Sequence, residues 1–104
     1  MNYDDIEILF AEDSMEDATL TIRALNKSGF TNKLLHVKDG AEALDFMYCR
    51  GFYSERNPKS HPKLFLLDLK MPKMSGIQVL EKIKGDIQFK SIPVVILTSS
   101  QEDP

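Results

Sequence analysis

Residues 64–76 read LFLLDLKMPKMSG, and this segment indicates the architecture of the whole chain. Its first four residues are continuously apolar, which is typical of a parallel strand covered by helices on both faces. The apolar run ends at Asp68, and Ser75 then begins a helix. The apolar residues of this helix recur at helical spacing, as Ile77, Leu80 and Ile83. The stretch therefore predicts a buried strand, a polar loop and a helix that packs on a sheet.

The segments on either side repeat this alternation of short apolar runs and helical patterns. Strands are expected at residues 6–11, 33–37 and 92–97, and residues 51–62 are expected to form a surface loop. Helices are expected after Ser14 and Asp39, each of which precedes a carboxylate residue by three positions, as in a capping box. Helix-length connections between strands predict parallel pairing with right-handed crossovers. The fold class is therefore α/β, with an open parallel sheet.

The composition limits the chain to one ordinary domain, residues 1–104. Hydrophobic residues make up 42% and charged residues 28%, which is typical of a globular protein. The net charge of −3 excludes the basic footprint of a nucleic-acid binder, and no apolar run is long enough to span a membrane. Cys49, the single cysteine, excludes an internal disulfide and fits a reducing compartment, so we expect a cytoplasmic protein.

Polar side chains follow three of the four expected strands. Glu12 and Asp13 follow the first, Asp68 follows the third and Thr98 follows the fourth. If these strands are neighbours, the side chains share the rim where open parallel sheets bind ligands. Three carboxylates at such close range repel one another, and the usual remedies are a raised pKa, which leaves one of them protonated, or a bound cation. Hard oxygen ligands beside water favour Mg²⁺.

A carboxylate beside Mg²⁺ can act as a nucleophile toward a phosphoryl group, to which the hydroxyl of Thr98 could donate a hydrogen bond. Each feature alone has a plainer interpretation. An acidic pair after a strand often only complements the dipole of the next helix, and a threonine there is often a helix cap. His36 and His61 have no partner at metal-ligand spacing and are expected to be structural.

The chain resembles the receiver domain of two-component response regulators, the chemotaxis-type phosphoacceptors. The matching segments cover nearly the whole chain: ILFAEDS at 8–14, KDGAEAL at 38–44, LLDLKMPKMSG at 66–76 and IPVVILT at 92–98. The loop at residues 51–62 further resembles the single-domain subfamily that partners phytochrome-type histidine kinases. The resemblance implies a flavodoxin-like receiver fold with strand order 2-1-3-4 for the strands present.

The resemblance also assigns roles to individual positions. It implies that Asp68 is the phosphoacceptor and a Mg²⁺ ligand, with Asp13 as a direct ligand and Glu12 acting through water. The backbone carbonyl of Lys70 is implied as a further ligand, and Thr98 as the switch hydroxyl. The implied partner is a sensor histidine kinase. The domain would then catalyse only its own phosphorylation and dephosphorylation, as a signalling module.

The family pattern continues past the fourth strand, whereas this sequence ends at Pro104. The family's fifth strand, with its active-site lysine, and its last helices have no counterpart, so we expect a receiver domain that is incomplete at the C-terminus. Lys70 and Lys73 lie on a different loop and do not replace that lysine. An apolar strand at the sheet edge invites pairing with another chain, which predicts self-association through residues 94–97.

Two alternatives stay open at this stage. Without the family's lysine, the chain could be a protein-interaction module that does not accept a phosphoryl group. It could also be a phosphatase with an aspartyl nucleophile, but such haloacid-dehalogenase-type enzymes place a second aspartate two residues after the nucleophile. Lys70 occupies that position here, and their nucleophile follows the first strand, so this alternative is disfavoured.

Overall fold

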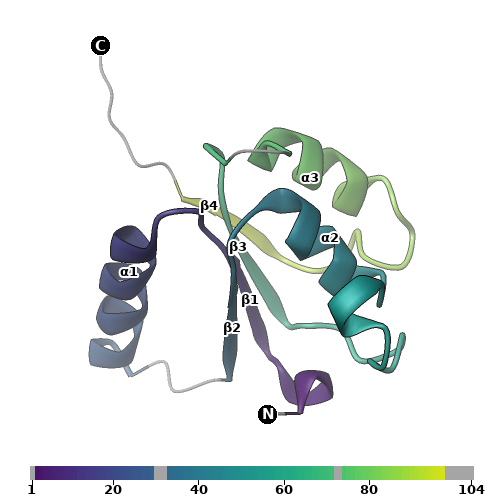
Figure 1. The fold of residues 1–104 in the computed structure, drawn as a ribbon, viewed down its shortest axis with the longest axis horizontal. Coiled ribbons are helices and arrows are strands. Elements are labelled where there is room, and N and C mark those ends of the chain that lie inside the picture. The colour runs from purple at the N-terminus through teal and green to yellow at the C-terminus, as the bar shows by residue number, and fades with distance from the viewer. Residues whose placement is uncertain (1, 30–32, 72–73, 98–104) are drawn as a thin grey trace.

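A parallel four-stranded sheet forms the centre of the computed structural model, which describes residues 2–29, 33–71 and 74–97 (Figure 1). The strands lie in the order β2-β1-β3-β4, as the resemblance implies, and their bounds are Ile8–Ala11 (β1), Leu34–Val37 (β2), Leu64–Asp68 (β3) and Val94–Leu97 (β4). The strands β1 and β4 begin later than the sequence predicts, because turns occupy the residues that were expected to come first. The N–H of Ile6 bonds to the carbonyl of Tyr3, and that of Ile92 bonds to the carbonyl of Phe89.

Three α-helices connect the strands: α1 (Met15–Lys27), α2 (Gly40–Met47) and α3 (Gly76–Lys84), with short 3₁₀ helices at Tyr3–Asp5 (η1) and Gly51–Tyr53 (η2). The predicted caps Ser14 and Asp39 are confirmed, since each side chain accepts a backbone N–H three residues later. The N–H of Ser14 donates to the carboxylate of Glu12, which precedes the helix, and not to that of Asp17, as a capping box would require. No helix within the described ranges is both long and apolar enough to cross a membrane.

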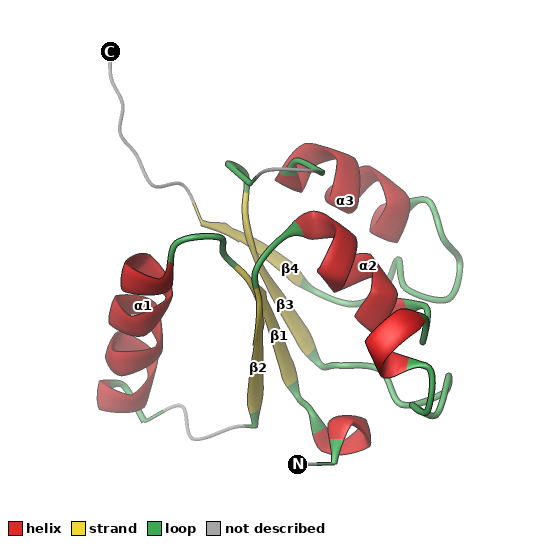
Figure 2. Ribbon diagram, viewed as in Figure 1, coloured by secondary structure: helices red, strands yellow, loops and turns green. Residues whose placement is uncertain are grey.

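The helices cover the two faces of the sheet unequally, with α1 on one face and α2 and α3 on the other (Figure 2). Successive residues of β1 alternate between two cores. Leu9 and Ala11 belong to the larger core under α2 and α3, whereas Ile8 and Phe10 belong to the smaller core under α1. Because both faces of the strand are buried, its sequence is a continuous apolar run, as predicted.

The strand β4 lies at one edge of the described sheet and pairs with β3. Val94 and Ile96 pack against the larger core, while Val95 points to the opposite face and stays 45% exposed. Self-association through this strand stays a prediction.

The segment 51–62 is more than the surface loop that its polar composition predicts. Tyr53 and Arg56 are only 3% and 6% exposed. The hydroxyl of Tyr53 donates to Glu42 Oε2 at 2.6 Å, and the guanidinium of Arg56 stacks on the ring of Phe46 at 3.9 Å. It also donates to the carbonyls of Phe46 and Ser60. Composition does not predict the burial of these two side chains, because a polar side chain can be buried when its donors find acceptors.

Candidate functional site

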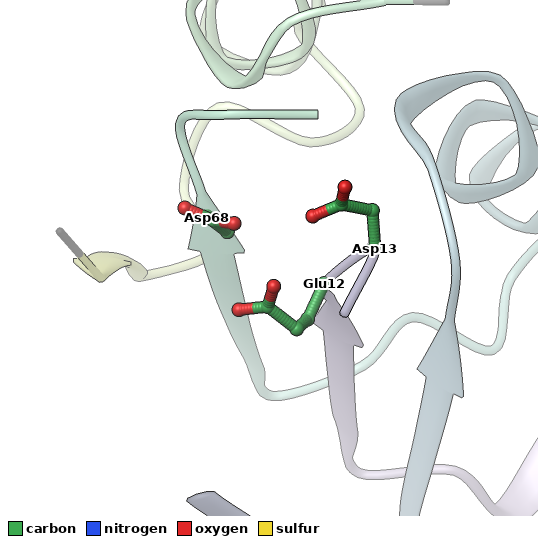
Figure 3. A group of neighbouring side chains, drawn as sticks. All are labelled: Glu12, Asp13 and Asp68. Carbon is green, nitrogen blue, oxygen red and sulfur yellow. The ribbon is translucent and has the colours of Figure 1, made fainter. Parts of the chain in front are cut away.

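The acidic residues predicted from the strand ends lie together. Ala11 of β1 pairs with Leu67 of β3, so the next residues, Glu12 and Asp68, end neighbouring strands side by side. Glu12 is 5% exposed and Asp68 3%, whereas Asp13 is exposed one residue further on. One carboxylate oxygen from each of the three residues lies within 4.8 Å of the other two (Figure 3).

Backbone N–H groups orient the two buried carboxylates. The N–H of Ser14 donates to Glu12 Oε2 at 3.1 Å, and the N–H of Lys70 donates to Asp68 Oδ1 at 3.2 Å. Each bond joins a carboxylate to the backbone two residues later, in the loop that follows the strand. Both donors also offset part of the negative charge of the oxygens that they contact.

The start of α3 packs directly against the end of β3, and this contact requires a glycine. A Cβ on Gly76 would lie 2.5 Å from the Asp68 carbonyl oxygen and 2.6 Å from Leu69 Cα. The N–H of Gly76 donates to the carbonyl of Leu69 at 3.1 Å. These close contacts give a steric reason for glycine at position 76. The glycine lets the backbone that carries Asp68 lie close to the helix.

The electrostatics of the site favour one positive charge among the carboxylates. Burial, followed by the nearby charge of Asp68, raises the pKa of Glu12 from 4.5 to about 7. Near neutral pH the site therefore reduces its own repulsion by holding a proton on Glu12 for part of the time. A divalent cation among hard carboxylate oxygens would do the same more fully, so the residues present fit Mg²⁺ or a similar ion.

An open hollow of about 550 Å³ lies against the acidic group on the α1 side. Its lining combines two of the site carboxylates with side chains of α1 and β4: Glu12, Asp17, Leu20, Thr21, Asp68, Ile96 and Leu97. The hollow is large enough to hold a small group such as a phosphoryl group beside Asp68.

Two other predicted site residues are not tested by this geometry. Thr98 lies outside the described residues, as do Pro72 and Lys73 of the loop after β3. Lys70 is described, and its N–H contacts Asp68, but the ligand role of its carbonyl stays a prediction.

Sequence reasoning missed one contact of this site. Nε2 of His36, on β2, lies 2.6 Å from the backbone carbonyl oxygen of Glu12. The sequence did carry a signal, because His36 is the penultimate residue of the strand that pairs with β1. A long polar side chain at that position reaches the same rim as Glu12.

Comparison with known proteins identifies the family. Residues 8–104 match the response regulator receiver domain. The chain belongs to this family. Among curated relatives, response regulator Rcp1 of Synechocystis is 41% identical over 96 residues, which are 92% of this chain and 63% of Rcp1. The chain thus spans less than two thirds of the length of that relative.

Solved structures of receiver proteins share the fold. The bacteriophytochrome response regulator RtBRR superposes with a TM-score of 0.85 at 44% identity, covering 89% of this chain and 55% of RtBRR. The Mn²⁺-bound form of Rcp1 gives 0.79 at 38% identity, covering 92% and 67%. The phosphorylated cyanobacterial phytochrome response regulator RcpA gives 0.78 at 37% identity, covering 93% and 68%. The predicted receiver fold is confirmed, and the phytochrome-type names agree with the predicted subfamily.

Proposed function

We propose that this receiver domain is a phosphoacceptor switch in which Asp68 takes a phosphoryl group from a histidine kinase. The observation that carries the proposal is the position of Asp68, a nearly buried carboxylate at a strand end with Glu12 and Asp13 within reach. The N–H of Lys70 orients this carboxylate, and the hollow beside it has room for a phosphoryl group. Positioning of this kind accounts for most of the catalysis in phosphoryl transfer.

The proposed step forms one bond and breaks another at phosphorus. A carboxylate oxygen of Asp68 attacks the phosphorus of a phosphohistidine, and the P–N bond breaks with its electron pair returning to the imidazole. The product is an acyl phosphate on Asp68 and a free histidine on the kinase. Hydrolysis reverses the modification, because water attacks the same phosphorus and the departing carboxylate is restored with release of inorganic phosphate.

Four groups of this chain would hold a divalent cation at the acidic site. Asp13 and Asp68 would contact it directly, the Lys70 carbonyl would be a further ligand, and Glu12 would act through water. When bound, the ion supplies positive charge that offsets the carboxylates and the oxygens of the transferring group. The close approach of the three carboxylates and the Mn²⁺-bound form of Rcp1 support this assignment.

The remaining assignments come from the family. Thr98 would donate its hydroxyl to the phosphoryl group and so couple phosphorylation to a change in partner affinity. A sensor histidine kinase of the phytochrome type is the proposed donor, supported by the names of RtBRR and RcpA, and the proposed compartment is the cytoplasm. RcpA in its phosphorylated form supports the modification itself.

Labelling with acetyl phosphate and Mg²⁺ tests the proposal. The chain should gain one phosphoryl group by intact mass, and Asp68→Asn should abolish the gain. Asp45→Asn is the matched control, because Asp45 is paired with Arg50 on the surface, where the two side chains are 44% and 59% exposed. Equal labelling of Asp68→Asn and wild type would contradict the assignment. A wild-type chain that takes no label would favour the alternative, an interaction module without phosphotransfer.

A further inference from the structure

His36, on β2, makes a hydrogen bond to the backbone of Glu12, one of the acidic residues of the site. Nε2 of His36 lies 2.6 Å from the carbonyl oxygen of Glu12, and the imidazole is half-buried. A carbonyl oxygen can only accept, so this nitrogen carries the proton and donates it. The ring also packs against Phe10, with centroids 5.6 Å apart, which limits its freedom to swing away.

This bond extends the attachment of β1 to β2 beyond the paired residues. The register between the two strands ends at Ala11 and Val37, and the N–H of Glu12 then donates to the Val37 carbonyl at 3.0 Å. After Val37 the chain leaves the sheet, because Asp39 caps α2. The imidazole thus holds the Glu12 carbonyl at the point where the pairing between β1 and β2 ends.

The carbonyl that His36 holds belongs to the peptide unit between Glu12 and Asp13. A peptide unit is planar, so fixing its carbonyl also fixes the direction of the Asp13 N–H and the start of the Asp13 residue. The side chain of Glu12 is fixed separately, by the N–H of Ser14. With both contacts in place, the two acidic side chains are held toward Asp68 (Figure 3).

We propose that His36 is a positioning residue for cation binding: its N–H to the Glu12 carbonyl fixes the Glu12–Asp13 peptide so that both acidic side chains converge on Asp68. The inference rests on the proposed function. Replacement of a residue that orients a metal ligand without contacting the metal commonly lowers metal affinity 10- to 100-fold. Because His36 holds a backbone group and not a ligand atom, we expect an effect near the lower end of that range.

Calorimetric titration of the metal-free chain with Mg²⁺ tests the inference, using His36→Phe and His36→Gln. His36→Phe keeps a ring against Phe10 but removes the donor, and it should weaken Mg²⁺ binding about 5- to 20-fold. His36→Gln keeps an N–H donor and should stay within about threefold of wild type. The NMR signal of the Asp13 amide, which belongs to the held peptide, should shift or broaden in His36→Phe without any metal.

His61→Phe is the matched control. Nε2 of His61 also faces a backbone carbonyl, that of Pro58 at 3.1 Å, and its ring packs on Phe89. Because His61 precedes β3, it lies at the opposite end of the strands from Asp68, and its replacement should leave Mg²⁺ affinity unchanged. The unfolding free energy of each variant without metal shows whether the fold has weakened.

Three outcomes overturn the inference. A folded His36→Phe that binds Mg²⁺ as tightly as wild type shows that the histidine is merely structural. A His36→Gln as weak as His36→Phe shows that the donor does not matter. If the wild-type chain does not bind Mg²⁺, both this inference and the cation assignment of the proposed function are wrong. In the first two outcomes, the proposed function still stands.

Discussion

Glu12 and Asp68 lie side by side at the ends of two neighbouring parallel strands, both nearly buried, and their carboxyl groups interact directly. Within the part of the chain that the structure describes, backbone N–H groups orient the two carboxylates, and no basic side chain contacts them. The pair therefore stores unfavourable electrostatic energy at neutral pH, which a proton or a cation relieves. This relationship makes the site responsive to pH and to divalent ions.

Stability without metal should depend on pH through Glu12. The pKa of Glu12 is about 7 in the folded chain and near 4.5 in the unfolded chain, so the folded state binds more protons between these values. The free energy of unfolding should therefore fall as pH rises from about 4.5 to 7, then level off. The shift corresponds to about 3 kcal/mol at most. Urea unfolding at several pH values in EDTA measures this slope.

Glu12→Gln should remove that slope, because glutamine has a similar shape and cannot ionise. At pH 8 without metal, the variant should be more stable than wild type by roughly 1–3 kcal/mol. Glu16→Gln, an exposed change on α1, is the control and should change stability little. An unchanged pH profile in Glu12→Gln would show that another group carries the dependence.

Mg²⁺ should stabilise the folded chain, and Asp13→Asn should remove most of this effect. A ligand at 100 times its dissociation constant adds about 2.7 kcal/mol, which thermal melts with and without Mg²⁺ can detect. Asp13 is exposed, so its replacement should leave stability in EDTA nearly unchanged. Asp45→Asn, which changes a surface carboxylate paired with Arg50, is the control. Equal stabilisation of Asp13→Asn and wild type by Mg²⁺ would rule Asp13 out as a ligand.

Gly76→Ala should destabilise the chain and disturb the site together. Its Cβ would meet backbone atoms of Asp68 and Leu69 at 2.5 and 2.6 Å, and neither can move without shifting the end of β3. We expect a loss of about 2–4 kcal/mol, as for other overpacked positions, measured by urea unfolding. Gly85→Ala is the control, since its nearest backbone atom would lie at 3.0 Å, and its cost should be smaller.

Arg56 should matter for stability far more than its neighbour Arg50. Arg56 is 6% exposed, stacks on Phe46 and donates to two backbone carbonyls. Arg56→Ala would therefore remove the donor from both carbonyls and the cation from the face of the Phe46 ring. A loss of about 2–4 kcal/mol is expected. Arg50→Ala removes a surface pair with Asp45 and should cost under about 1 kcal/mol. Similar losses for the two variants would contradict the anchoring role of Arg56.

The order of the elements and the strand ends that carry chemistry could be predicted from the amino-acid sequence. The apolar runs, the caps at Ser14, Asp39 and Ser75, and the acids at positions 12, 13 and 68 are local signals. Local signals can be read because periodicity and capping depend on residues a few positions apart. The meeting of the strand ends also required the strand order, which the family resemblance implied and no local pattern gave.

The contacts between distant segments could be found only in the folded structure. The burial of Tyr53 and Arg56 depends on Glu42 and Phe46 of α2, and the bond from His36 to Glu12 joins residues 24 positions apart. The raised pKa of Glu12 likewise depends on how deeply the fold buries it beside Asp68. Hydrogen bonding and desolvation depend on distances in space, which no local pattern along the chain encodes.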